Sequence, residues 1–127
     1  AEVFGDPAKL VRLERILHPR VIARVLEARS MLAEDAVLVV EAIKLLESSL
    51  RNVCDQVWVV LAPREIMLER LAARGVAPAE ASVRLGHQRS AEEFRAAADV
   101  VIANDGDREA TREQVRRAWE ALPRATA

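Results

Sequence analysis

The sequence has little of what metal centres and covalent crosslinks require. Its 127 residues include one cysteine, Cys54, and two histidines, His18 and His87. One cysteine cannot form an internal disulfide, and two distant histidines without paired cysteines argue against a zinc site. No histidine lies near Cys54 in the sequence, so we interpret this cysteine as structural rather than as a nucleophile.

Long apolar runs and an excess of one charge are also missing. No apolar run approaches the roughly 18 residues of a membrane-spanning helix, and no signal peptide is visible. Nineteen lysines and arginines face twenty aspartates and glutamates, which gives a net charge of -1. No overall field therefore directs the chain to nucleic acid or to a membrane surface. We expect a cytoplasmic protein that binds neither.

A glycine-rich phosphate loop of the G-x-x-x-x-G-K-[ST] type does not occur in these residues. Arginines are candidates for phosphate contacts, because guanidinium groups pair well with phosphate oxygens. Five of them follow the ends of expected strands or flank a weakly apolar stretch: Arg64, Arg70, Arg74, Arg84 and Arg89. This pattern favours phosphoryl transfer, which is catalysed mainly by positioning and by charge neutralisation.

Three short apolar runs are expected to form strands, at 36–41, 57–62 and 100–103. The first begins with five consecutive apolar residues, which is typical of a strand buried on both faces of a parallel sheet. Helical patterns separate the runs, so the sequence predicts an α/β architecture. Glu41 ends the first run. It lies either at the ligand-binding carboxyl edge of the sheet or only at the positive, amino-terminal end of a helix over 43–50.

Capping residues, prolines and glycines delimit the expected helices. Asp6-Pro7 begins a helix that we expect to stop at Leu17, because Pro19 disfavours the helical conformation of the residue before it. A second helix would then complete a helical hairpin over residues 4–35. Residues 75–98 bury little apolar surface and are expected to form a mobile lid. Further helices are expected from Pro63 to Gly75, from Pro78 to Gly86, after the Ser90–Glu93 capping box, and from Asp107 to Pro123.

The order of the segments is specific. The chain contains, in this order, VFGDPAKLVRLERILHPRV, VVEAIKLLESSL, CDQVWVVLAPREIMLERLAARG, RLGHQ and ADVVIANDG. Together they resemble the carboxyl-terminal portion of dephospho-CoA kinase, a family of P-loop kinases that use ATP and Mg²⁺ to phosphorylate the 3′-hydroxyl of dephospho-CoA. The resemblance implies one partial domain over 1–127. It would have a P-loop-kinase-like parallel sheet with flanking helices, and the first strands of that sheet would be missing. Residues 4–35 would be a helical CoA-binding element and 75–98 the lid.

The resemblance implies four substrate-binding residues. His18-Pro19 matches the family's Leu-His-Pro element, and His18 either contacts substrate or packs at a helix junction. Glu41–Glu47 matches a family segment that usually reads Asp-x-Pro-Leu-Leu-Phe-Glu. Glu41 replaces its aspartate, Ile43 its proline and Lys44 its first leucine. The resemblance assigns His18, Glu41, Lys44 and Glu47 to the substrate, and it implies that Glu41 orients magnesium-bound water as the one candidate catalytic residue.

The resemblance likewise implies ATP-binding residues. Arg70 and Arg74 match the arginines that enter the lid, and Arg84 with Gln88 matches its Arg-x-x-x-Gln element. Asn104 matches the asparagine of a Val-Ile-Asp-Asn-Ser-Gly loop that adjoins the adenine. Two neighbouring positions differ, because Ala103 replaces the aspartate and Asp105-Gly106 replaces Ser-Gly. ATP and Mg²⁺ are the implied cofactors, and none of these residues is expected to bind the metal directly.

The same resemblance implies what these residues lack. The phosphate loop and the aspartate that acts as general base belong to the family's amino-terminal part, so we expect no turnover by this chain alone. The three expected strands would be the third, fourth and fifth of a P-loop kinase, with a gap that the amino-terminal part or another copy of the chain fills. Two other functions stay open: a catalytically inactive α/β interaction module, and a kinase of another nucleotide-like substrate.

Overall fold

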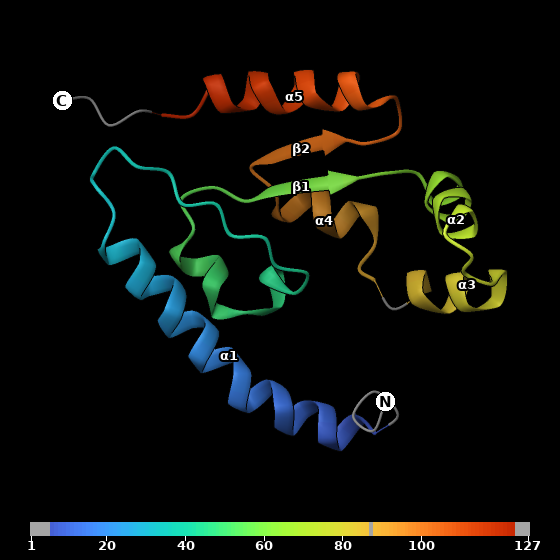
Figure 1. Cartoon of the computed structure of the whole chain (residues 1–127), viewed down its shortest axis with the longest axis horizontal. Helices are drawn as coiled ribbons and strands as arrows, with labels where there is room; N and C mark the ends of the chain where they lie inside the picture. Colours follow the sequence, from blue (N-terminus) through green and yellow to red (C-terminus); the bar gives the residue numbers. More distant parts are fainter. Residues whose placement is uncertain (1–5, 87, 124–127) are drawn as a thin grey trace. The chain divides into compact units, whose positions relative to one another are not determined.

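The structure is a computed structural model that describes residues 6–86 and 88–123. The described residues divide into two compact units, one over residues 6–54 and the other over Asp55–Pro123. Figure 1 shows the elements of both units in chain order. Within the described part of the chain, no helix combines the length and the apolar character needed to cross a membrane.

The first unit is dominated by one long helix, α1 (Pro7–Ser30). It begins as expected, because the Asp6 side chain accepts hydrogen bonds from the backbone N–H groups of Ala8 at 3.0 Å and Lys9 at 3.2 Å. The expected break at His18-Pro19 is wrong, since Pro19 lies inside the helix. The helix continues through Pro19, although proline removes one backbone hydrogen bond and weakens the helix at that point. There is therefore no hairpin, and the start of region 4–35 lies outside the described residues.

The expected strand at 36–41 is also wrong, because this segment has no regular secondary structure. A strand is stable only when a neighbouring strand pairs with its backbone. Among the described residues of the first unit, none forms such a neighbouring strand. The segment instead exposes apolar side chains: Val37 is 53% exposed and Val39 75%. The helix expected over 43–50 is replaced by two 3₁₀ turns, η1 (Leu45–Glu47) and η2 (Ser49–Val53).

The second unit contains a two-stranded parallel sheet, β1 (Trp58–Leu61) and β2 (Val100–Ala103). Trp58 pairs with Val100 and Leu61 with Ala103, so two of the three expected strands and their parallel direction are confirmed. Val57 and Ile102, each 2% exposed, form the centre of the core. The α/β class is therefore confirmed, with a smaller sheet than the apolar runs predicted.

The described part of the second unit has four helices, α2 (Arg64–Ala73), α3 (Pro78–Gly86), α4 (Ala91–Ala97) and α5 (Arg108–Glu120), of which α4 and α5 pack on the sheet while α2 and α3 pack on each other. Helix α5 runs beside β2 and α4 beside β1, as Figure 1 shows. Their expected starts are confirmed, whereas α5 ends at Glu120, before the expected Pro123. Gly75 has a positive φ of 79° after α2, Ser90 and Glu93 form the capping box of α4, and Asp107 caps α5.

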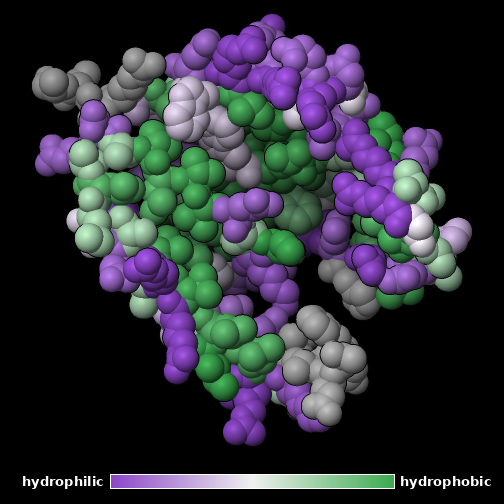
Figure 2. Space-filling model, in the orientation of Figure 1, coloured by the Kyte–Doolittle hydropathy of each residue, from purple (hydrophilic) through white to green (hydrophobic). Residues whose placement is uncertain are grey.

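Figure 2 shows how the side chains divide on one face. A hydrophilic band follows α5 along the top of the view, where its arginines and glutamates lie. Hydrophobic residues reach the surface on the left, over α1 and the segment that follows it. Ile43, in that segment, is 100% exposed. Exposed apolar surface of this extent commonly marks an interaction site.

Candidate functional site

The first unit brings together two of the four residues that the resemblance assigns to the substrate. His18, half-buried on α1, and Lys44, just before η1, line the same pocket of about 90 Å³. Its other lining residues are Val21, Ile22, Ala42, Ser48 and Leu50. A pocket of this size admits one chemical group rather than a whole nucleotide, because ligand sites for drug-sized molecules enclose roughly 300–1,000 Å³.

An ion pair joins the two segments that form this pocket. The Nζ atom of Lys44 donates to Oε1 of Glu14 at 2.6 Å, across 30 positions of sequence. This hydrogen bond lowers the pKa of the Glu14 carboxyl, and the nearby His18 lowers it further. The same bond raises the pKa of Lys44, to which Glu47 contributes a smaller increase. The four side chains thus form one electrostatic cluster on the first unit.

Glu14 is a member of this cluster that sequence reasoning missed. It precedes His18 by four positions, so both side chains lie on the same face of α1. That spacing was the available signal. The partner of Glu14, however, comes from a distant segment whose position depends on tertiary structure.

The structure places Glu41 apart from this pocket. Its side chain is exposed and is not among the pocket's lining residues. Because the preceding segment is not a strand and the next helical turn begins at Leu45, neither expected setting for Glu41 is formed. Its substrate contact and its catalytic role stay predictions.

The second unit brings together two of the residues assigned to ATP. Arg70 of α2 donates from Nη1 to the backbone carbonyl of Asn104 at 2.9 Å, and both residues are partly buried. Asn104 follows β2 directly, and its N–H donates to the carbonyl of Leu61 at 2.7 Å. The pair therefore lies at the carboxyl ends of both parallel strands, where open α/β sheets bind ligands.

Three other residues assigned to ATP lie elsewhere on the second unit. Arg74 is exposed at the carboxyl end of α2, and Arg84 pairs with Glu80 one turn earlier on α3. Gln88 is exposed, and its backbone N–H donates to Leu85 at 3.3 Å. Among residues 6–86 and 88–123, no hydrogen bond or ion pair joins these three side chains to Arg70 or Asn104. His87 of the RLGHQ motif lies outside these ranges.

The His, Cys, Asp and Glu side chains of the described residues do not form a metal site by themselves. Across the ranges that the structure describes, no three His, Cys, Asp or Glu residues are grouped so that they would hold an ion. Mg²⁺ keeps several waters and often binds through one or two carboxylates together with the phosphates of its substrate. A magnesium ion would therefore need the phosphates of a bound nucleotide as ligands.

Two polar residues of α5 complete the surroundings of Asn104. Thr111 Oγ1 lies 3.4 Å from Asn104 Oδ1, and the carboxamide of Gln114 bonds to the backbone of Ala103. Sequence reasoning missed both residues. The available signal was their position on the same side of the helix as its apolar stripe, which begins at Val115.

Comparisons with known proteins identify a family. The sequence profile described as Dephospho-CoA kinase matches residues 1–110. The dephospho-CoA kinase of Thermobifida fusca is 37% identical over 123 residues, which are 96% of this chain and 62% of that protein. The enzyme of the same name from Deinococcus radiodurans is 40% identical over 125 residues, which are 96% of this chain and 60% of that protein.

A solved structure shows the same relationship. The chain is similar to TT1252 from Thermus thermophilus, with a TM-score of 0.76 and 30% identity. The similarity covers 95% of this chain and 63% of that one. This chain thus spans about six tenths of the length of these three proteins.

Proposed function

This chain belongs to the dephospho-CoA kinase family, and from that premise we propose that it supplies the substrate-binding and adenine-binding sides of a kinase that phosphorylates the 3′-hydroxyl of dephospho-CoA. The family prediction made from the order of the segments is confirmed. The reaction, its substrates and its partners are proposals, since the chain spans only part of its relatives.

One observation carries this proposal. The residues that the resemblance assigns to each ligand also separate by unit: His18 and Lys44 share a pocket in the first, and Arg70 and Asn104 share a contact in the second. Such a separation is expected of an enzyme that binds two substrates on different parts of its fold.

On the substrate side, Lys44 is the proposed anion-binding residue. Dephospho-CoA carries phosphate oxygens, and an ammonium group forms short charge-assisted hydrogen bonds to them. Glu14 holds the ammonium group at the pocket in the absence of ligand. Val21 and Ile22 offer apolar contacts next to it. Glu41 and Glu47, both exposed, are proposed to complete the substrate contacts from the same segment.

On the ATP side, Asn104 is the proposed adenine neighbour and Arg70 its support. Arg84 and Gln88 are proposed to contact ATP from the lid over 75–98, and Arg74 from the end of α2 directly before it. When bound, Mg²⁺ would neutralise phosphate charge during transfer. The described residues supply no cluster to hold the ion without ATP.

We expect no turnover by these residues alone, because the sequence contains no phosphate loop.

A strand from the part of the relatives that this chain does not match is the proposed partner of segment 36–41. The carbonyls of Val57 and Leu61 accept hydrogen bonds on the β2 side of β1, so by alternation Trp58 and Val60 direct their backbone groups to its open edge. Val60, at this edge, is 58% exposed.

Calorimetric titration of the 127-residue chain with dephospho-CoA tests the proposal. We expect binding by the wild type and about tenfold weaker binding by Lys44→Gln, because a charge-assisted hydrogen bond is lost. The matched control is Lys9→Gln, which removes the other lysine of the sequence, outside the pocket. Equal affinity of the two variants would contradict the role of Lys44.

An inactive interaction module is the alternative that the exposed apolar segment favours. This segment exposes the apolar side chains of Val37, Val39 and Ile43. Light scattering after size exclusion measures whether the chain associates with itself. A folded chain that binds neither dephospho-CoA nor ATP but forms a stable dimer would favour this alternative over the kinase.

A further inference from the structure

The outer edge of β2 is closed by a side chain instead of a strand. The N–H groups of Val100 and Asn104 bond toward β1, so alternation directs the backbone groups of Ala103 to the opposite edge. There Ala103 donates its N–H to Gln114 Oε1 at 2.8 Å, and Gln114 Nε2 donates to the Ala103 carbonyl at 2.8 Å. The Gln114 carboxamide thus takes the place of a peptide group from a third strand.

The chemistry of this contact requires a carboxamide. Gln114 offers one acceptor and two donors, and all three functions are used, because Nε2 also lies 3.3 Å from the Ala110 carbonyl. A glutamate of the same shape accepts from the Ala103 N–H but cannot donate to the carbonyl while it is ionised. A leucine of similar volume leaves both backbone groups of Ala103 without this partner.

The contact belongs to a larger set that fixes the end of β2. Gln114 binds the two backbone groups of Ala103, Leu61 accepts from the N–H of Asn104, and Arg70 donates to the Asn104 carbonyl. Every backbone polar group of these two consecutive residues is therefore hydrogen bonded. The position of the Asn104 side chain follows from this backbone, with Thr111 beside its Oδ1 atom.

We propose that Gln114 is a positioning residue for the adenine nucleotide: it holds the end of β2 so that Asn104 presents its carboxamide to the ligand. This inference rests on the proposed ATP side of the kinase. Gln114 touches the backbone of Ala103 rather than the nucleotide, and it acts through Asn104. Its loss is expected to weaken ATP binding while leaving dephospho-CoA binding in the first unit unchanged.

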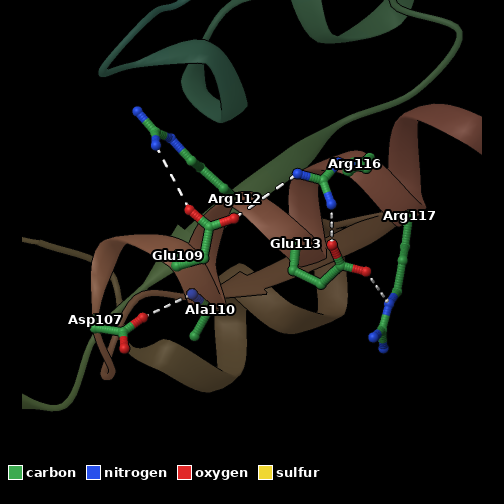
Figure 3. Close-up of polar contacts among 7 residues, drawn as sticks. All are labelled: Asp107, Glu109, Ala110, Arg112, Glu113, Arg116 and Arg117. Atoms are coloured by element: carbon green, nitrogen blue, oxygen red, sulfur yellow. Dashed lines mark hydrogen bonds and ion pairs between the residues drawn. The ribbon is translucent and has the colours of Figure 1, made fainter.

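The opposite face of α5 does not offer a competing nucleotide site. Figure 3 shows its arginines paired within the helix: Glu109 pairs with Arg112 and Arg116, and Glu113 with Arg116 and Arg117. These are the solvent-exposed pairs expected on the outer face of a helix. Glu120, on the same helix and outside these pairs, provides a control position.

The test is a nuclear magnetic resonance titration of the ¹⁵N-labelled 127-residue chain with ATP, following the amides of residues 103–111. The wild type and Glu120→Gln are expected to bind with equal affinity. Gln114→Leu is expected to bind roughly three- to tenfold more weakly, the effect of losing ordinary hydrogen bonds. The Ala103 amide of this variant is expected to exchange with solvent faster. Calorimetry with dephospho-CoA checks that the first unit is unaffected.

The variant Gln114→Glu distinguishes a loss of the positioning of Asn104 from a general loss of stability. It also replaces Gln114→Leu in the titration if that variant does not fold. Near pH 7.5 its carboxylate lacks the donor, so weak ATP binding is expected. Toward the ordinary pKa of a glutamate, 4.5, the protonated acid again offers a donor and an acceptor, and its affinity should approach that of the wild type at the same pH.

Each outcome decides one of the two proposals. Equal ATP affinity of the wild type, Gln114→Leu and Gln114→Glu at pH 7.5 would overturn the positioning role and leave the proposed function intact. If ATP causes no shift in the wild type, the ATP side of the proposed function fails and the positioning role fails with it. Faster exchange at Ala103 would in that case report only a structural contact.

Discussion

Glu14 and Lys44 give the first unit a pH dependence whose sign follows from the directions of their shifts. The pKa of Glu14 lies below its ordinary value of 4.5, mainly because of the hydrogen bond from Lys44. Folding therefore favours the ionised form, and the contribution is lost as pH falls through the folded-state pKa. The pKa of Lys44 lies above its ordinary value of 10.5, so that contribution is lost as pH rises through the folded-state pKa.

The pair is accordingly expected to stabilise the first unit most between pH 4.5 and 10.5. Replacing Glu14 by Gln should lower the thermal midpoint slightly within this window and have a smaller effect on either side of it. Thermal unfolding of the wild type and Glu14→Gln across the pH range measures the difference. A difference that grows as the solution is acidified below this window would contradict the assignment, and Glu120→Gln provides the control.

Among the elements, α4 shows how local chemistry determines a boundary. Ser90 accepts a hydrogen bond from the Glu93 N–H at 3.1 Å, and Glu93 accepts one from the Ser90 N–H at 2.8 Å. The latter bond is the main reason why the pKa of Glu93 is lowered. Both bonds satisfy donors that the start of a helix would otherwise leave unpaired.

Ser90→Ala should destabilise the second unit by about 1 kcal/mol, because alanine cannot accept the capping bond. Denaturant titration measures the free energy of unfolding. Ser82→Ala makes the same change inside α3, where alanine is the better helix former, and is expected to be neutral or slightly stabilising. Equal destabilisation by both substitutions would show that the capping bonds contribute nothing measurable.

The elements predicted correctly are those whose signals are local. The caps at Asp6, Ser90 and Asp107 depend on neighbouring residues, and the glycine after α2 depends on its own backbone angle. The failures have other causes. Pro19 was expected to end a helix that it only weakens, and the apolar run at 36–41 lacks a partner strand among the residues that the structure describes. Apolar composition alone does not supply that partner.

The candidate sites were predictable only in part for the same reason. The resemblance singled out His18, Lys44, Arg70 and Asn104, and the structure places them in two pairs. The partners that hold them could not be inferred from spacing. Glu14 reaches Lys44 across 30 positions, and Gln114 reaches Ala103 across 11.

At the scale of the whole molecule, most of the buried apolar residues in the described part of the chain lie in the second unit: Val57, Ala81, Leu85 and Ile102, against Leu50 in the first. Ile102 is 2% exposed in the second unit, so Ile102→Ala should cost roughly 2–5 kcal/mol through lost burial and the cavity left behind. Val101, its neighbour on β2, is 39% exposed. Val101→Ala is therefore the matched control, with an expected cost below about 1 kcal/mol. Similar unfolding free energies for the two variants would contradict the position of the core.

The placement of β1 and α5 in one unit has an optical consequence. Both tryptophans of the sequence, Trp58 and Trp119, lie in these two elements, and the chain has no tyrosine. Tryptophan emission therefore follows the second unit alone, whereas far-ultraviolet circular dichroism also senses α1. In Ile102→Ala we expect emission to change at lower denaturant concentration than dichroism, because the substitution leaves the first unit untouched. Coincident transitions would mean that the two units unfold as one cooperative body.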